Sequence, residues 1–260
     1  MQTVAKVLRM RIQDLGFRRS RAALCGLISL GLAACASTDV PTADAPDPLE
    51  PVNRTVHAFN KGLDRFALRP ASQVYVRVVP SPVRTGVSNL NSNLSQPLVV
   101  VNYALQGKIE QSGQAFARLG INTLLGIGGL LDPATEFGLV EDPTDFGETL
   151  AVWGAPSGPY VELPLFGPST VRDTLGIAAE FAADQVPEII EEDLTGVLIG
   201  LQVGDVLQTR DDLKRVLDAL LYESADSYAA TRIAFLQNRA RQLNEGLALE
   251  DLEDPYAFDE

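Results

Sequence analysis

The segment that most constrains this chain is a short apolar run that ends in small residues directly before a cysteine. Basic residues precede the run at positions 6, 9, 11, 18, 19 and 21, and the run itself extends from Ala22 to Leu32. It continues into Ala33-Ala34-Cys35. Basic, apolar and small-residue regions in this order are typical of a secretory signal. The cysteine after them predicts a lipoprotein whose first mature residue, Cys35, is acylated.

A membrane-spanning helix is the alternative interpretation of the same run. Such a helix needs about 20 apolar residues, and the run has about half that length. An ordinary export signal needs no cysteine after its small residues. Residue 36 is Ala rather than Asp. In a Gram-negative lipoprotein this resembles the default pattern, which is sorted onward to the outer membrane.

The signal sets the boundaries of the remaining parts. Residues 1–34 are predicted to be the signal peptide, and 35–46, rich in Pro, Ala, Asp and Thr, a flexible tether. Residues 47–245 are predicted to form one helical domain. The acidic segment 246–260 has no apolar period and is predicted to be disordered.

Charge and cysteine content exclude several classes of function. From Cys35 onward the chain has 15 Lys and Arg against 33 Asp and Glu, a net charge of −18. Such a surface argues against nucleic acid and against electrostatic docking on anionic headgroups. Cys25 lies in the signal and Cys35 is consumed by lipid, so the mature part has no disulfide. Its stability must come from packing.

The patterning of the remaining chain predicts a mostly α-helical domain. Near its start, apolar residues recur with helical spacing at 52, 56, 59, 63 and 66. Polar residues, His57 among them, fall on the other face of this helix. Further helices are expected over 82–94, 98–105, 107–125, from a cap at 169–170 to 181, from Pro187 onward, and over 211–243. The β-branched run 74–79 looks like a strand in isolation, and 142–168, rich in Gly and Pro, is expected to be irregular.

One segment stands out because it carries no charge. Residues 121–131 are apolar or Gly apart from Asn122 and Thr123, and they are too few to span a bilayer. The composition fits a buried turn, a re-entrant hairpin or an interfacial segment. An ordinary buried helix end with a glycine cap is an equally good interpretation.

The sequence lacks the combinations of residues that catalysis or metal binding requires. His57 is the only histidine and has no acidic triad partner evident in the sequence. The glycines at 126–129 lack the Lys-Ser/Thr of a phosphate-binding loop. Asp142, Asp145 and Glu148 lack the spacing of a calcium loop. The sequence therefore predicts neither an enzyme, nor a metal site, nor a cofactor.

Four blocks of residues carry a resemblance to the VacJ/MlaA family of outer-membrane lipoproteins. Their order behind the acylated cysteine makes the resemblance specific. The blocks are Asp47-Pro48-Leu49-Glu50-Pro51-Val52-Asn53-Arg54 with Phe59-Asn60; Asn89, Asn93, Pro97, Val101-Asn102 and Leu105-Gln106-Gly107; Arg118, Asn122-Thr123, Gly126, Gly128-Gly129 and Asp132; and Asp145 to Leu150, Trp153-Gly154, Gly158-Pro159-Tyr160, Leu163-Pro164, Gly167-Pro168 and Arg172-Asp173.

The resemblance implies a fold and a function. It implies an all-α, ring-like domain embedded in the inner leaflet of the outer membrane, anchored by lipid on the periplasmic side. It also implies a passage for phospholipids that leave the outer leaflet, a soluble periplasmic carrier that receives them, and association with a trimeric porin. A structural lipoprotein that scaffolds porins without moving lipid is the alternative function.

Two places are candidates for the lipid passage or its gate. The first is the charge-free segment, because its glycines permit unusual backbone angles. The second is Phe59-Asn60, near the middle of the first helix. Asn53, Arg54 and Asn60 have an alternative role, which is to satisfy buried backbone groups. The first candidate comprises Leu124, Leu125, Gly126, Ile127, Gly128, Gly129, Leu130 and Leu131.

Overall fold

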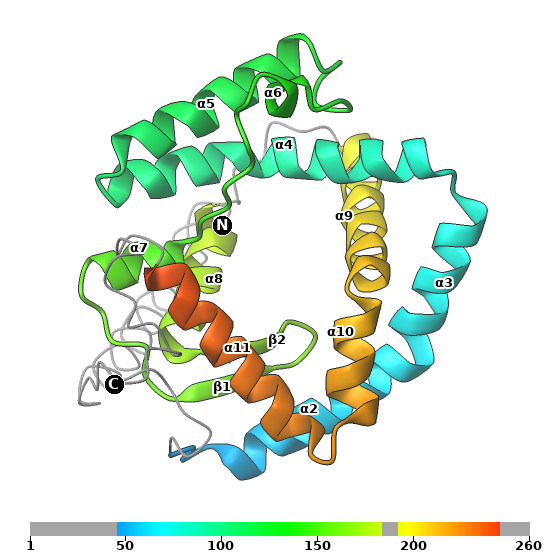
Figure 1. The fold of residues 1–260 in the computed structure, drawn as a ribbon, viewed down its shortest axis with the longest axis vertical. Coiled ribbons are helices and arrows are strands. Elements are labelled where there is room, and N and C mark those ends of the chain that lie inside the picture. The colour runs from blue at the N-terminus through cyan, green and yellow to red at the C-terminus, as the bar shows by residue number, and fades with distance from the viewer. Residues whose placement is uncertain (1–45, 184–191, 245–260) are drawn as a thin grey trace, which may run out of the picture. The chain divides into compact units, whose positions relative to one another are not determined.

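The fold comes from a computed structural model that describes residues 46–183 and 192–244 (Figure 1). The chain divides into two units, 1–38 and 39–260, and all described residues belong to the second. Cys35, the tether before Pro46, the predicted helix start at Pro187 and the acidic tail lie outside the described residues.

The described unit is mainly helical, as the sequence predicts. Its two strands form one antiparallel hairpin, in which Tyr160 lies opposite Thr170 and Leu163 opposite Gly167. In chain order the elements are α2 (Glu50–Leu63), the π-helix η1 (Asp64–Leu68), α3 (Arg69–Val78), α4 (Ser81–Leu105), α5 (Ile109–Leu124), α6 (Pro133–Glu136), α7 (Phe146–Val152), β1 (Tyr160–Leu163), β2 (Gly167–Thr170), α8 (Val171–Ala183), α9 (Glu192–Asp212), α10 (Lys214–Asp218), the π-helix η3 (Ala219–Glu223) and α11 (Ser227–Asn244).

Within this unit the elements contact one another around a closed circuit (Figure 1). From α2 the contacts run through η1 to α3, then to α9, α4, α7 and α8, and through β1 back to α2. α5 packs on α4, and α11 contacts both η3 and β2. The predicted ring-like helical arrangement is therefore confirmed.

Side-chain caps define several helix starts, and residue type predicts one of them. Thr170 Oγ1 accepts a hydrogen bond from Asp173 N at 3.1 Å, which confirms the predicted cap of α8. The Asp145 side chain caps α7 by accepting from Glu148 N at 2.8 Å. The sequence does not predict α7, because the surrounding glycines and prolines suggested irregular structure.

Two further expectations from local propensity are wrong. The run 74–79 is not a strand, because Val74 to Val78 lie in α3, where contacts with α9 outweigh β propensity. The expected helix break before Pro97 does not occur, since α4 continues through it to Leu105. Over 211–243, where one or two helices are expected, α10 continues directly into η3 and α11 follows as a separate helix.

The first helix is inverted relative to an ordinary surface helix. Its apolar stripe forms as predicted, but most of it faces outward, with Val52 62% and Phe59 55% exposed, whereas Leu63 is half-buried. Its polar face is the buried one, since Asn53 and His57 are almost fully buried. A helix with this pattern requires polar partners inside and tolerates an apolar environment outside.

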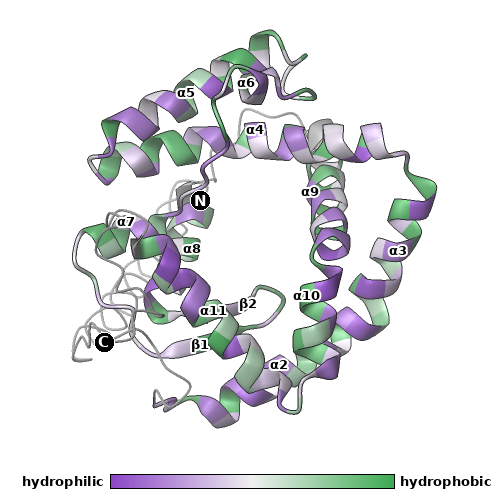
Figure 2. Ribbon diagram, in the orientation of Figure 1, coloured by the Kyte–Doolittle hydropathy of each residue, from purple (hydrophilic) through white to green (hydrophobic). Residues whose placement is uncertain are grey.

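The hydrophobic core is small for a chain of this length. Exposed apolar residues instead recur along the helices, and the second half of α11 is hydrophilic (Figure 2). Among the described helices, none combines the length and apolarity that crossing a membrane requires. The core has two clusters, which are Val99, Tyr103 and Ala115 between α4 and α5, and Tyr160, Tyr228 and Leu236 between β1 and α11.

Candidate functional site

A pocket of about 280 Å³ lies where six elements meet, which are α2, η1, β2, α9, α10 and η3. The turn between β1 and β2 points toward α10 (Figure 1), and its residues form one wall. Apolar side chains dominate the lining, and polar groups gather on one side. The lining residues are Asn60, Leu63, Asp64, Leu68, Leu165, Phe166, Gly167, Val206, Thr209, Arg210, Leu217 and Leu221.

A charged network forms the polar side of this pocket. Arg210 donates from Nε and Nη2 to the two carboxylate oxygens of Asp64, at 2.6 and 2.9 Å. Its Nη2 also donates to Asp218 at 2.8 Å, and Arg69 donates to the other oxygen of Asp218 at 2.8 Å. Tyr222 OH donates to Asp64 at 2.7 Å. The network therefore joins η1, α3, α9, α10 and η3.

Asp64 and Arg210, the ion pair at the centre of this network, are both charged at neutral pH. Burial by itself raises the pKa of Asp64, but hydrogen bonds from Arg210 and Tyr222 outweigh it and leave that pKa below its ordinary value. The Asp64 hydrogen bond raises the pKa of Arg210. Burial and the bond to Asp64 raise the pKa of Tyr222 to about 12, so this phenol stays protonated.

Two asparagines of α2 hold the hairpin against the pocket. Asn53 donates to Tyr160 O and accepts from Glu162 N, both at 3.0 Å. Asn60, two helical turns later, donates to Leu163 O and accepts from Leu165 N, both at 2.9 Å. The amides thus pair with the open edge of β1 as a neighbouring strand would. The alternative role in the sequence analysis, satisfying backbone groups, is the one that the structure gives both asparagines.

Phe59 does not share this position. Its side chain is 55% exposed, and it does not line the pocket, whereas Asn60 does. The two members of this candidate therefore differ, since one supports the pocket wall and the other lies on the outer apolar face of α2.

The charge-free segment lies apart from the pocket lining. Leu124 is 82% and Ile127 69% exposed, so the segment is not a buried turn. Ile127 has a positive φ of 57°, which a β-branched residue adopts only under strain. A strained, exposed apolar turn costs free energy in water. This cost indicates that the segment serves a purpose other than packing the unit.

A buried network fixes the base of that segment. Arg118 donates to Asp132 at 3.1 Å, and Asn122 donates to the same carboxylate at 2.9 Å. The backbone approaches so closely at Gly126 that an added Cβ would lie 2.4 Å from the carbonyl oxygens of Asn122 and Leu131. The exposed apolar residues are therefore presented on a fixed frame.

His57 has partners that the sequence did not identify. Its Nε2 lies 3.1 Å from Ser227 Oγ, and its Nδ1 lies 3.5 Å from Glu162. Lys61 also donates to Ser227 Oγ at 3.1 Å. The Glu162 distance is too long for the hydrogen bond that orients a catalytic histidine, and Ser227 lines neither the pocket described above nor the small one beside Tyr103 and Arg118. We assign this group to packing between α2, β1 and α11.

A second charged cluster joins α11 to α7 and α8. Arg239 donates to Asp145 at 2.7 and 2.8 Å, to Asp173 at 3.0 Å and to Glu148 at 3.2 Å. Burial raises the pKa of Glu148. Within 46–183 and 192–244, no group of three His, Cys, Asp or Glu residues is arranged to hold a metal ion.

The sequence gives little indication of the polar side of the pocket. Asp64 falls at the end of a helix whose regular apolar stripe is the stronger pattern. Arg210 is the first Lys or Arg after Arg172, but Asp211 and Asp212 follow it directly, so no local pattern marks it as a buried residue.

Comparison with known proteins gives the relationship of this chain. Residues 45–242 match the sequence profile described as MlaA lipoprotein. The chain belongs to the MlaA lipoprotein family. The match begins and ends close to the boundaries predicted for the helical domain.

Members of the MlaA family resemble the chain over most of its length. The intermembrane phospholipid transport system lipoproteins MlaA of Shigella flexneri and of Escherichia coli (strain K12) are each 36% identical to it over 233 residues, 87% of this chain and 89% of theirs. A solved structure described as "Structural basis for maintenance of bacterial outer membrane lipid asymmetry" matches with a TM-score of 0.65 and 36% identity, over 76% of this chain and all of that chain.

Proposed function

We propose that this protein is an outer-membrane lipoprotein of intermembrane phospholipid transport. It removes mislocalised phospholipid from the outer leaflet, maintains lipid asymmetry and passes the lipid to a soluble periplasmic carrier. The pocket is the observation that carries this proposal, because it combines apolar walls with a charged side. The names of the MlaA relatives support it.

The chemistry of the pocket suits part of a phospholipid. Acyl chains require apolar walls, which Leu63, Phe166 and Leu217 supply, and a headgroup requires polar groups, which lie at Asp64 and Arg210. A volume of about 280 Å³ is at the lower end of small-ligand sites, roughly 300–1,000 Å³. The site therefore holds a portion of the lipid as it passes. No cofactor or catalytic step is required, because binding and guiding suffice and energy is supplied elsewhere.

The outer surface suits embedding in one leaflet from the periplasmic side, with Cys35 as the anchor. Exposed apolar residues occur on α2, α3 and α5 and in the charge-free segment. A helix keeps its backbone hydrogen bonds satisfied in hydrocarbon, so short apolar helices can enter one leaflet without spanning it. A trimeric porin is the proposed neighbour in the membrane.

Leu124–Leu131 is the proposed apolar gate, and Phe59-Asn60 is the second place where gating is set. Changing Leu124 and Leu125 together to Asp places two charges on exposed apolar positions. We expect the variant, at wild-type abundance, to let phospholipid accumulate on the cell surface. Deleting Phe59-Asn60 removes the second asparagine contact with the hairpin, and we expect it to disturb lipid asymmetry. If the deletion variant is folded and abundant but leaves lipid asymmetry unchanged, this role is excluded.

Lipid extraction distinguishes transport from the alternative of a porin scaffold that moves no lipid. The full-length acylated protein is purified in detergent, and bound phospholipid is quantified by mass spectrometry. A transport protein retains phospholipid in a defined molar ratio that resists detergent washing. A scaffold retains little beyond its own anchor, and that result would contradict the proposal.

A further inference from the structure

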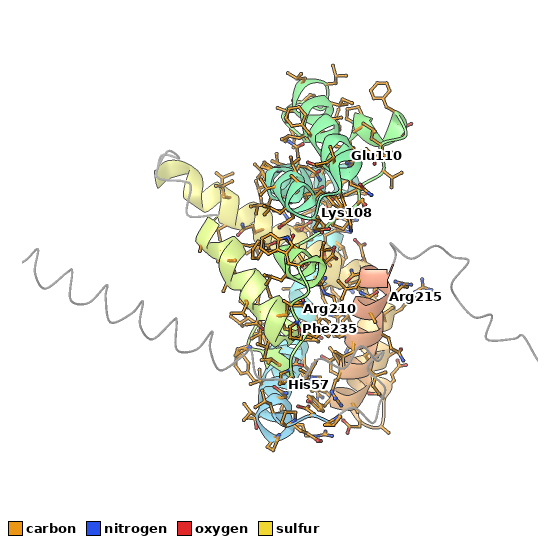
Figure 3. The ribbon with its side chains drawn as sticks, turned by 90° about the vertical axis from the view of Figure 1, so that its left-hand side faces the viewer. His57, Lys108, Glu110, Arg210, Arg215 and Phe235 are labelled. Carbon is orange, nitrogen blue, oxygen red and sulfur yellow. The ribbon has the colours of Figure 1, made fainter. Side chains whose placement is uncertain are left out.

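The side chain of Arg210 is buried at the pocket, with only 5% of its surface exposed. Figure 3 labels it between the levels of Lys108 and His57 along the long axis. Arginine has five N–H donors on three nitrogens. Nε and Nη2 make the three hydrogen bonds to Asp64 and Asp218. These bonds fix the plane of the guanidinium group.

The remaining nitrogen, Nη1, has no hydrogen-bond partner among the described residues. It is also not one of the buried nitrogens that lack both solvent contact and a partner in this part of the chain. Since Arg210 lines the pocket, the two N–H donors of Nη1 are available to a molecule inside it. A fixed guanidinium with free donors is suited to a phosphate oxygen, with which arginine forms strong charge-assisted hydrogen bonds.

The charges around Arg210 balance. Arg210 and Arg69 carry two positive charges, and Asp64 and Asp218 carry two negative ones. A phosphate that is itself neutralised by an attached ammonium adds no net charge to this buried cluster. An anionic lipid adds one uncompensated negative charge, which is costly at a buried site.

Two π-helices in the described part of the chain, η1 and η3, converge on this cluster. Asp64 begins η1, and Leu68 at its end lines the pocket. Tyr222, which donates to Asp64, lies in η3, and the neighbouring Leu221 lines the pocket. π-helical insertions are uncommon and are frequent at functional sites. Both insertions therefore contribute to the place where Arg210 meets the pocket.

We propose that Arg210 Nη1 binds the phosphodiester of a zwitterionic phospholipid in the pocket, with Asp64 and Asp218 holding the guanidinium in position. The inference deepens the proposed transport function and rests on it. It assigns headgroup recognition to one side chain and leaves the acyl chains to the apolar walls.

The test replaces Arg210 with Lys in the full-length protein. Lysine keeps the positive charge for Asp64 and Asp218 but has no forked donor left for the pocket. Native mass spectrometry measures binding of phosphatidylethanolamine and of phosphatidylglycerol from mixed micelles. We expect Arg210→Lys to weaken binding of phosphatidylethanolamine about tenfold or more, as loss of a charged hydrogen bond predicts. Wild type should bind phosphatidylethanolamine several-fold more tightly than phosphatidylglycerol.

Arg215→Lys is the matched control, because Arg215 is an exposed residue of α10 that neither belongs to the network nor lines the pocket. It should bind lipid like wild type. Equal binding by wild type and a folded Arg210→Lys would overturn the inference while leaving transport intact. Absence of lipid from wild type itself would contradict the transport function instead.

A crosslink keeps the inference testable if Arg210→Lys does not fold. A benzophenone amino acid at Leu221, in a chain that retains Arg210, should crosslink to phosphatidylethanolamine. Excess phosphatidylethanolamine should abolish the crosslink, and excess inorganic phosphate should leave it in place. Displacement by inorganic phosphate would assign the site to free phosphate and overturn the lipid assignment. Failure to crosslink would also overturn it.

Discussion

Replacing Asn60 with Ala should loosen the hairpin wall of the pocket at a modest cost in stability. The change removes two hydrogen bonds of 2.9 Å, to Leu163 O and from Leu165 N, and a longer one of 3.3 Å to Glu162 Oε1. Each is worth about 0.5–1.5 kcal/mol net, and water can replace the exposed bond to Leu165. We therefore expect a loss of about 1–2 kcal/mol.

Asn53→Ala is the matched control, because the same amide makes the equivalent pair of bonds at the start of β1. Asn53 is 1% exposed, so its loss leaves the buried Tyr160 O and Glu162 N without partners. Each unsatisfied buried group costs about 1–3 kcal/mol. We expect a loss of roughly 3–5 kcal/mol, about twice that of Asn60→Ala or more.

Circular dichroism at 222 nm of the detergent-solubilised proteins measures both losses. At about 2–4 °C per kcal/mol for a domain of this size, Asn60→Ala should lower Tm by about 5 °C and Asn53→Ala by more than about 10 °C. Well below both transitions, Asn60→Ala should exchange a fluorescent phospholipid faster than wild type, because the turn carrying Leu165 and Phe166 is released. An equal fall in Tm for both variants, or unchanged lipid exchange in Asn60→Ala, would refute this reasoning.

Two further predictions concern the apolar segment and an exposed ion pair. Gly126→Ala should lower Tm more than Gly128→Ala. A Cβ added at Gly126 lies 2.4 Å from two carbonyl oxygens, whereas a Cβ added at Gly128 has no atom within 4 Å. Equal Tm values for the two variants would contradict the close approach at Gly126. Hydrogen bonds from Arg54 lower the pKa of Asp226 to about 2. Its stabilising contribution is thus present above about pH 4, where the unfolded carboxyl ionises, and is lost as the pH falls through about 2. Carboxyl NMR titration should give this value, and Arg54→Gln should return it toward about 4; an ordinary value in wild type would argue against the pair.

Sequence patterns predicted the elements whose formation depends on neighbouring residues in the chain. Helical periodicity found α2 and α5, and residue type found the Thr170 cap. The same patterns wrongly predicted a strand at 74–79 and a helix break before Pro97. Contacts with α9 determine the first segment, and the packing of the long helix α4 determines the second. The sequence also did not show which face of α2 is buried. An amphipathic stripe has the same period whether it faces a core or an apolar exterior.

The candidate site was only partly predictable for a related reason. Asn60 was singled out by a motif, and the structure places it at the pocket. Arg210 and Asp64 are 146 positions apart, so only the closed circuit of helices brings their charges together. The segment Leu124–Leu131 was recognised by its lack of charge, but its distance from the pocket lining depends on the packing of α5 and α6.

The most direct test of the account is the amount of phospholipid in the outer leaflet of a strain that lacks this protein. Surface-accessible phospholipid is measured by outer-leaflet phospholipase cleavage, with wild type, Arg210→Lys and Arg215→Lys supplied in trans at equal abundance. The account predicts accumulation in the deletion strain, restored to normal by wild type and Arg215→Lys but not by Arg210→Lys. Unchanged surface phospholipid after confirmed loss of the protein would contradict retrograde lipid transport and favour a structural role in the envelope.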